Sequence, residues 1–386
     1  MQRDEWRTPD VWKIAGSAFF ADLGYQAVLA IFPLFLVLSL KAPVWVYGLA
    51  MALAYGPGSL IAWWGGRVGD RVGHRRIAVL GNSLIPLLSL IGLSATPPMA
   101  VALMAGGWWA RNFRTPSRRV LLVHRVQDPA AQRAAFGFLH ALDVGGGVLA
   151  GLGVIALVAS HWSLSAIFLL TLLPLVASTL LLTMLGPEPP PRGAGAGPTA
   201  SAATPDPRVQ RLLWAAGLYG FSSYNLGFPI LTLAQHTRSN ALGVTSYVVF
   251  LGVSALVGWL YGQRSQGRLG ELGVLGYGAA AVGSAALAAA VALHGGFWAL
   301  ILPVAALGFA LGVIETAEPA LVAQWVPAPR GGGGMGALTA ARSLGLFAAN
   351  VVMGVLYHVT PVAAYGYAAA VAVLAAGILL SAPSRR

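Results

Sequence analysis

The sequence predicts an all-helical membrane protein with twelve transmembrane helices in two six-helix bundles and both termini in the cytoplasm. Three observations lead to this prediction. Apolar stretches of about twenty residues, the length that spans a bilayer, recur along the whole chain. Hydrophobic residues make up 57% of the chain and charged residues only 9%, whereas soluble domains carry about 25% charged residues. Basic residues gather in alternate connecting segments.

The apolar stretches define the expected spans and their grouping. The first six are expected at residues 14–38, 44–64, 77–95, 99–122, 134–159 and 164–185. The second six are expected at residues 209–233, 242–261, 272–293, 297–322, 334–358 and 362–381. Residues 186–207 are rich in Pro, Gly, Ala and Ser, which is typical of a flexible linker. The sequence therefore predicts an N-terminal bundle at 1–185, a cytoplasmic linker at 186–207 and a C-terminal bundle at 208–386.

The distribution of basic residues supports this topology. With both termini inside, only Lys41 and Arg238 fall in outer segments, and every other lysine and arginine lies in a cytoplasmic segment or at a cytoplasmic helix end. The net charge of +12 is therefore explained by membrane topology, and we expect no nucleic-acid partner. The chain contains no cysteine and shows neither a histidine pair at i, i+4 nor a phosphate-binding glycine loop. We expect no metal and no cofactor.

The segment at residues 65–76 carries the most specific motif of the chain. Its spacing, Gly66-x-x-x-Asp70-Arg71-x-Gly73-x-Arg75-Arg76, resembles the loop 2–3 signature of the major facilitator superfamily. The glycines predict a tight turn, and the carboxylate is expected to pair with an arginine or to cap a helix. A related segment at residues 258–268 follows the eighth span with Gln263 in place of the aspartate, so the second half echoes the first.

This resemblance implies a fold and an activity. Members of the superfamily are secondary transporters that move a small molecule by alternating access, so we expect no enzymatic activity. In the family, loop 2–3 braces the two halves and helps to set the outward-facing state, and the fourth span typically carries a functional arginine. Proton antiporters of the family carry a Gly-Pro signature in the fifth span. Here Leu152 follows Gly151, which argues against the antiporter interpretation.

Four acidic residues lie inside the expected spans, where ionisable groups are costly and by default mark a pathway, a proton relay or a helix–helix contact. Asp143, with His140 three residues earlier on the same face, is our first candidate for proton coupling, because an imidazole titrates near neutrality. Asp22, Glu315 and Glu318 are the alternative candidates. The other possibility for each residue is a permanent ion pair or hydrogen bond that only fixes the packing of helices.

Polar and aromatic side chains inside the spans are candidates for substrate binding. Arg111 and Arg114 share a face of the fourth span and would attract an anionic substrate, whereas Arg118 and Arg119 are expected at the cytoplasmic surface. The complete set of substrate-binding candidates is Tyr25, Gln26, Arg111, Arg114, Tyr219, Ser223, Asn225, Tyr247 and Asn350.

Together these observations predict a monomeric, proton-coupled secondary transporter of the bacterial inner membrane, with an organic anion or polar metabolite as substrate. Two alternatives stay open. The aromatic residues and the few polar groups of the spans would also suit efflux of an amphipathic compound. A transporter-like sensor or assembly protein would need no proton relay, and the buried carboxylates argue against it.

Overall fold

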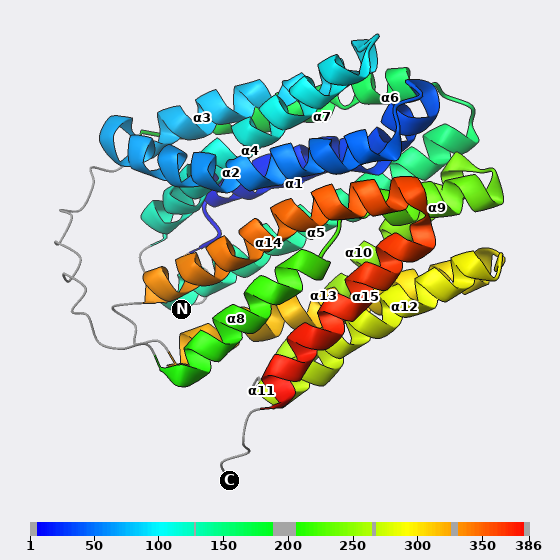
Figure 1. Cartoon of the computed structure of the whole chain (residues 1–386). Coiled ribbons are helices and arrows are strands. Elements are labelled where there is room, and N and C mark those ends of the chain that lie inside the picture. Colours follow the sequence, from blue (N-terminus) through cyan, green and yellow to red (C-terminus); the bar gives the residue numbers. More distant parts are fainter. Residues whose placement is uncertain (1–5, 127–128, 188–205, 265–267, 326–330, 382–386) are drawn as a thin grey trace. The chain divides into compact units, whose positions relative to one another are not determined.

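In the computed structural model, every regular element of residues 6–126, 129–187, 206–264, 268–325 and 331–381, the part of the chain that the structure describes, is a helix (Figure 1). The chain forms two compact units. Unit 1 comprises Met1–Ala42, Leu53–Pro190 and Asn240–Thr245, and unit 2 comprises Pro43–Ala52, Pro191–Ser239 and Ser246–Arg386. Most of the expected linker, residues 188–205, lies outside the described residues.

Most helices follow one another with short connections, whereas residues 184–206 separate α7 from α8. The first half of the chain contains α1 (Pro9–Pro33) continuing into the π-helix η2 (Leu34–Ser39), α2 (Val44–Val72), α3 (His74–Leu84) continuing into the 3-10 helix η3 (Ile85–Leu93), α4 (Pro97–Arg125), α5 (Pro129–Ala159), α6 (Leu164–Leu170) and α7 (Leu172–Thr183). The second half contains α8 (Pro207–Ser222), α9 (Gly227–Thr237), α10 (Asn240–Arg264), α11 (Leu269–Glu271) with η4 (Leu272–Gly278) and α12 (Ala279–Ala292), α13 (Phe297–Trp325), α14 (Gly331–Val359) and α15 (Pro361–Leu380).

Several helices begin with a hydroxyl or carboxylate cap followed by proline. Thr8 accepts a hydrogen bond from the backbone N–H of Val11 before Pro9, and Thr360 accepts one from Val362 before Pro361. Asp206 caps α8 by accepting from the N–H of Arg208 at 2.8 Å, which lowers the pKa of this exposed carboxyl below its usual value. Such caps satisfy N–H groups that have no partner within the helix, and proline at the first position has none to satisfy.

Within the described residues, ten helices are long and apolar enough to cross a membrane. They coincide with ten of the twelve expected spans. The fourth expected span is also one continuous helix, α4, but its central part carries three arginines. The seventh expected span is not continuous.

The seventh expected span, residues 209–233, is broken at residues 223–226, between α8 and α9. The prediction of one unbroken helix there is wrong, and the reason is Pro229. Proline lacks the N–H for a helical hydrogen bond, and its ring collides with the carbonyl group four residues earlier, at Asn225. Asn225 completes the break, because its Oδ1 accepts from the N–H of Gly227 at 3.1 Å at the start of α9. The break places polar groups in the interior of an apolar segment.

The connection between α2 and α3 is much shorter than expected. Since α2 runs to Val72 and α3 begins at His74, the predicted loop over residues 65–76 is reduced to one residue outside the helices. Gly73 has φ 99°, a backbone conformation that favours glycine. The earlier glycines serve packing instead, because a Cβ on Gly65 would collide with the carbonyl oxygen of Phe113 in α4.

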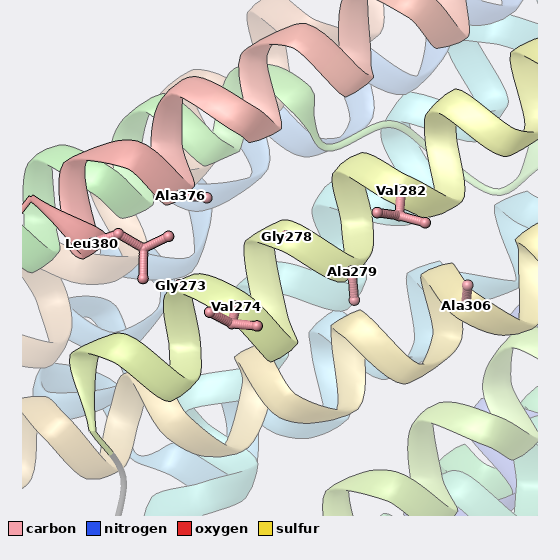
Figure 2. Close-up of a pocket in the computed structure, with 8 residues that line it drawn as sticks. All are labelled: Gly273, Val274, Gly278, Ala279, Val282, Ala306, Ala376 and Leu380. Carbon is pink, nitrogen blue, oxygen red and sulfur yellow. The ribbon is translucent and has the colours of Figure 1, made fainter.

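Unit 2 contains an apolar groove of about 420 Å³ between η4, α12, α13 and α15 (Figure 2). It is lined by Gly273, Val274, Gly278, Ala279, Val282, Ala306, Ala376 and Leu380. Binding sites for polar solutes need a few convergent polar groups, and these eight residues supply none from their side chains. We therefore interpret the groove as part of the lipid-facing surface.

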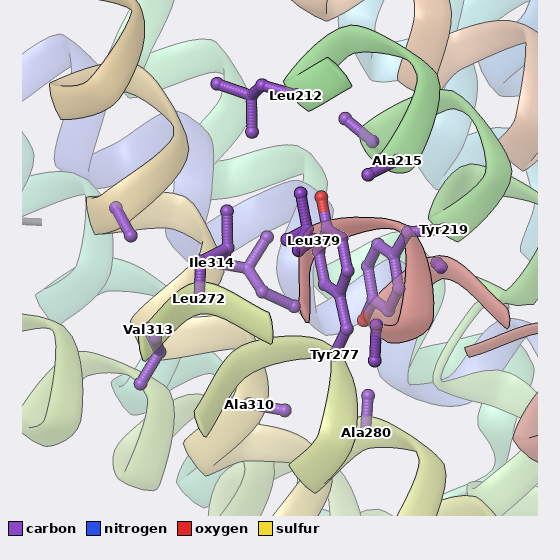
Figure 3. Packing of buried hydrophobic residues seen from close by; sticks show 14 of the residues in the cluster. Leu212, Ala215, Tyr219, Leu272, Tyr277, Ala280, Ala310, Val313, Ile314 and Leu379 are labelled. Atoms are coloured by element: carbon purple, nitrogen blue, oxygen red, sulfur yellow. The ribbon is translucent and has the colours of Figure 1, made fainter. Parts of the chain in front are cut away.

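Each unit has its own buried apolar core. In unit 1 the core lies between α1, α4, α5 and α7, with Ile14, Leu121 and Leu182 fully buried. In unit 2 it lies between α8, η4, α13 and α15, and Figure 3 shows the rings of Tyr219 and Tyr277 face to face at its centre. These two rings stack with centroids 4.4 Å apart and an interplanar angle of 3°. The stacked pair connects the apolar core to the polar groups described below.

We predict that Gly345→Ala destabilises unit 2 by about 1–3 kcal/mol, the usual cost of overpacking a core. A Cβ on Gly345 would lie 2.6 Å from the Cα of Gly220 and 2.7 Å from the carbonyl oxygen of Gly217, so α8 and α14 would have to separate. The measurement is thermal unfolding of the purified protein in detergent. Gly366→Ala is the matched control, because a Cβ there meets no atom within 4 Å. Equal melting temperatures for the two variants would contradict the prediction.

Candidate functional site

The candidate site of unit 1 is built where α5 crosses α1 at close range. A Cβ on Gly146 of α5 would lie 2.5 Å from the carbonyl oxygen of Phe19 and 3.2 Å from the Cβ of Asp22. One residue further on, a Cβ on Gly147 would lie 3.4 Å from the Cγ of Gln26. Because glycine removes these collisions, the acidic residue of α5, Asp143, lies close enough to Asp22 for their charges to interact.

Asp22 is the most enclosed acidic residue of unit 1, with 4% of its surface exposed. Its Oδ1 accepts a hydrogen bond from Nε2 of Gln26 at 3.3 Å. Its Oδ2 is buried and has no hydrogen-bond partner among the described residues. An ionised carboxylate in this position lacks a full set of hydrogen bonds, so its burial costs free energy. Binding of a proton, or of a ligand that donates a hydrogen bond, would reduce this cost.

Arg111 of α4 lies against two aromatic rings. Its guanidinium carbon is 4.9 Å from the ring centroid of Tyr25 and 4.7 Å from that of Trp108. The Nη2 atom also donates to the hydroxyl of Tyr25 at 3.4 Å, and Nη1 donates to Oδ1 of Asn112 at 3.2 Å. Cation–π contacts of this kind compensate part of the charge of a desolvated guanidinium.

Arg114 is 1% exposed and is among the largest fully buried side chains of the chain. Space for it arises at α3, where a Cβ on Gly81 would lie 2.7 Å from the Cβ of Arg114. Its Nε and Nη1 atoms are buried without a hydrogen-bond partner in the described part of the chain. The charges that act on it include those of Arg118 and Arg111, which are also positive, and that of Asp22, which is negative. An arginine stays protonated in proteins, so this charge is poorly compensated.

Arg118 is paired with Asp143. Its Nη2 lies 3.4 Å from both carboxylate oxygens of Asp143, and Arg118 is 5% exposed. The expectation that Arg118 lies at the cytoplasmic surface is therefore wrong, because α4 packs it against α5. Its helix neighbour Arg119 is exposed, as expected.

His140 does not join this group. The residue is exposed, and no hydrogen bond connects it to Asp143 within the described residues, although the two lie three positions apart on α5. Asp143 instead directs its carboxylate to Arg118, with 26% of its side chain exposed. The helical spacing correctly predicts proximity along α5, but packing of α4 selects the partner.

The motif at the α2–α3 connection forms a different set of contacts. Oδ1 of Asp70 lies 3.3 Å from Nε2 of His74, whose Nδ1 lies 3.2 Å from the hydroxyl of Ser117 in α4. The expectation that this carboxylate pairs with an arginine is therefore wrong, because the turn at Gly73 brings His74, the first residue of α3, beside it. Arg75 donates to the carbonyl oxygen of Thr183 at 2.7 Å, at the end of α7. The other members of the motif are placed as follows: Gly66 contacts Pro116, and Arg71 and Arg76 are exposed.

Unit 2 contains a second buried charged group, centred on Arg342 of α14. Glu315 and Glu318 of α13 both pair with it: Glu315 through a short hydrogen bond from Nη2, and Glu318 at 3.4 Å from Nη1. Glu318 is fully buried and accepts a hydrogen bond from the hydroxyl of Tyr277 at 2.6 Å, whereas the side chain of Glu315 is 52% exposed. Tyr219 covers this group through its stack on Tyr277. In this group two carboxylates share one arginine, so acidic groups outnumber basic ones. In the unit 1 group the arginines outnumber the carboxylates.

Polar candidates near the break between α8 and α9 contact one another. The backbone N–H of Asn225 donates to Oδ1 of Asn350 at 3.2 Å, and the hydroxyl of Tyr47 donates to Oδ1 of Asn225. Ser223 donates to the carbonyl oxygen of Tyr219 at 3.3 Å. Tyr247 is buried in α10, 4% exposed. Asn350 and Asn225 thus stabilise the break, because their side-chain oxygens accept hydrogen bonds there.

The alternative to proton coupling for Glu318, a permanent ion pair with an arginine, is present in the structure, with Arg342 as the partner. Sequence analysis missed a buried hydroxyl cluster in unit 2: Thr232 contacts the hydroxyls of Tyr357 and Tyr365 at 2.8 Å and 2.6 Å, and Tyr224 contacts Ser284 at 3.2 Å. The described residues contain no group of three or more His, Cys, Asp or Glu that could hold a metal ion.

Comparison with known families gives one match. The model of the Major Facilitator Superfamily matches residues 14–316, which is most of the chain. A search of curated protein sequences gives no match.

Solved structures with a similar fold are transporters. The nucleoside transporter NupG superposes with a TM-score of 0.76 at 13% sequence identity, over 96% of this chain and 97% of NupG. The peptide transporter POT gives a TM-score of 0.75 at 14% identity, over 96% and 93% of the two chains. The xylose transporter XylE from E. coli, in an inward open conformation, gives 0.70 at 13% identity, over 98% of both chains. At these identities the similarity concerns the fold.

We predict that Arg342→Met destabilises the protein by about 3–5 kcal/mol, because it leaves the buried carboxylate of Glu318 without its cation. The double variant Arg342→Met/Glu318→Gln should recover most of this loss, since it removes both charges. Chemical unfolding in detergent measures both. The control is Glu315→Gln, whose half-exposed side chain should contribute no more than about 1 kcal/mol. A double variant as unstable as the single one would show that the ion pair is not the cause.

Proposed function

Because this chain belongs to the Major Facilitator Superfamily, we propose that it is a secondary active transporter that moves a small solute by alternating access and couples this movement to protons. The observation that carries the proposal is the buried charged group on α1, α4 and α5 of unit 1. Ionisable groups are costly inside a membrane protein and are kept where a solute or proton needs them. The chain is a multi-pass membrane protein, and the substrate is moved rather than chemically converted.

The proposed topology has twelve spans, with both termini in the cytoplasm of a bacterial cell and the protein in its inner membrane as a monomer. Ten apolar helices, the arginine-bearing helix α4 and the broken pair α8–α9 support a topology of twelve crossings. The proposed bundles are residues 1–185 and 208–386, joined by the linker 186–207. The distribution of lysine and arginine supports this orientation.

Proton coupling is proposed to run through Asp143, with Asp22, Glu315, Glu318 and His140 as further candidates. Asp143 is half-buried, and no other carboxylate of the described residues forms an ion pair with Arg118. Proton binding to Asp143 would release Arg118, and the charge distribution of the site would change. Asp22 supports the same chemistry, because one of its oxygens is buried without a hydrogen-bond partner in the described residues.

The proposed substrate is an organic anion or polar metabolite, and the arginines of α4 support this choice. An alternative is multidrug-type efflux of amphipathic compounds. One observation favours it: the rings of Tyr25, Trp108 and Tyr55 form a contiguous aromatic group, with centroids 5.6 Å and 5.0 Å apart. A non-transporting sensor or assembly protein is the remaining alternative.

We predict that organic anions, and not lipophilic cations, raise the melting temperature of the purified protein in detergent. A ligand at a hundred times its Kd adds about 2.7 kcal/mol of stability, which a thermal-shift screen detects. Stabilisation by lipophilic cations alone would favour the efflux alternative. No stabilisation by any member of a broad library would favour the sensor or assembly role.

We predict that Asp143→Asn abolishes uptake driven by a proton gradient in proteoliposomes while the stabilising ligand still binds. The substitution keeps the size of the side chain and removes its ability to exchange a proton. Uptake of radiolabelled ligand with and without an imposed pH gradient is the measurement. Asp206→Asn serves as the control, since this residue is an exposed helix cap and asparagine caps equally well. Gradient-driven uptake that persists in Asp143→Asn would remove Asp143 from the coupling role.

A further inference from the structure

Arg111, Arg114 and Arg118 of α4 differ in how their charges are compensated. Arg111 lies against the rings of Tyr25 and Trp108 and donates to two oxygen atoms. Arg118 has an ion pair with Asp143, although its contact distances of 3.4 Å are long and its Nε and Nη1 remain without a hydrogen-bond partner in the described residues. Arg114 has neither compensation and is 1% exposed.

The charges of this group do not cancel. Three guanidinium groups face two carboxylates, Asp22 and Asp143, so the group carries an excess of positive charge even with both acids ionised. A buried, unpaired charge costs several kcal/mol, and arginine does not relieve it by losing its proton. An anion bound from solution would remove both the charge excess and the unsatisfied N–H groups of Arg114.

We propose that Arg114 and Arg118 form a binding site for one carboxylate or phosphoryl group of the transported solute, and that Asp143 occupies the Arg118 side of this site until the solute displaces it. This inference rests on the proposed transport function and names the chemical group that the transporter recognises. The planar guanidinium group binds carboxylate and phosphate through two parallel hydrogen bonds. Nε and Nη1 of each arginine are buried without a hydrogen-bond partner among the described residues and are therefore the N–H groups that a bound anion would satisfy.

Displacement of Asp143 links solute binding to coupling. The carboxylate of Asp143 is the internal anion for Arg118. Once the solute anion takes this position, Asp143 loses its cation and becomes available to bind a proton. Solute anion and proton would then be bound together, which is a requirement for their joint transport.

The test measures binding in detergent, without transport, by isothermal titration calorimetry with benzoate, benzamide and inorganic phosphate as probes. Benzamide has the shape of benzoate without its charge, so benzoate is expected to bind and benzamide is not. Binding of phosphate but not benzoate would show that the site recognises a phosphoryl group. Binding of both probes would show that it accepts a carboxylate as well as a phosphoryl group. Absence of binding by both anions would overturn the proposal.

Three variants identify the residues. Arg114→Met should abolish anion binding, and Asp143→Asn should tighten it by about tenfold, the equivalent of one charge-assisted hydrogen bond no longer contested by an internal anion. A gain of affinity cannot arise from misfolding. Arg119→Gln removes an exposed arginine of the same helix and should leave the affinity unchanged. Weaker binding in Asp143→Asn, or equal losses in Arg114→Met and Arg119→Gln, would overturn the assignment.

The binding test addresses the anion site and the transport test addresses the proposed function, so each proposal can fail while the other holds. If benzoate or phosphate binds and proteoliposomes transport neither, the anion site stands and the transport proposal fails. If proteoliposomes accumulate only cations or neutral solutes and neither anion binds, the anion site is wrong and the transport proposal stands.

Discussion

Compensation of buried charge is the constraint on which the two candidate sites of this protein depend. A guanidinium or carboxylate removed from water is stable only beside an opposite charge, a hydrogen-bond partner or an aromatic ring. Unit 2 satisfies this requirement internally, since Arg342 is shared by Glu315 and Glu318. Unit 1 satisfies it incompletely, because Arg114 has no such partner in the described residues. The two groups therefore differ in how completely the protein itself compensates their charges.

Glycine and proline place these charges. Gly146 brings the backbone of α5 against α1, and Gly81 leaves room for Arg114 between α3 and α4. Larger residues at either position would separate the helices and lengthen the distances between charges. Pro229 acts in the opposite way, because it breaks a span and exposes backbone groups that Asn225 and Asn350 then satisfy. Small residues thus set distances between helices, and proline sets where a helix is interrupted.

The fold that this chain shares with solved transporters describes its architecture, whereas the side chains of its own site bear on which solute it could bind. The fold is shared at 13–14% identity, which is too low to carry over a substrate. Transporters for nucleosides, peptides and xylose share this architecture, so the architecture alone does not select a substrate. Function in such a protein is argued from its site, because the same fold hosts many substrates.

The sequence by itself determined the membrane class, the positions of most helices and the family, because hydropathy and charge distribution follow directly from the solvent that each segment meets. It also singled out Asp22, Asp143, Arg111 and Arg114 from their depth in apolar segments, and in the structure Asp22 and Arg114 are buried and Asp143 and Arg111 partly exposed. Only the tertiary structure decided which charges pair: Asp143 with Arg118 and not with His140, Asp70 with His74 and not with an arginine. Helical periodicity predicts which residues share a face, but partners on other helices depend on how closely those helices pack, and this depends on contacts distant in sequence.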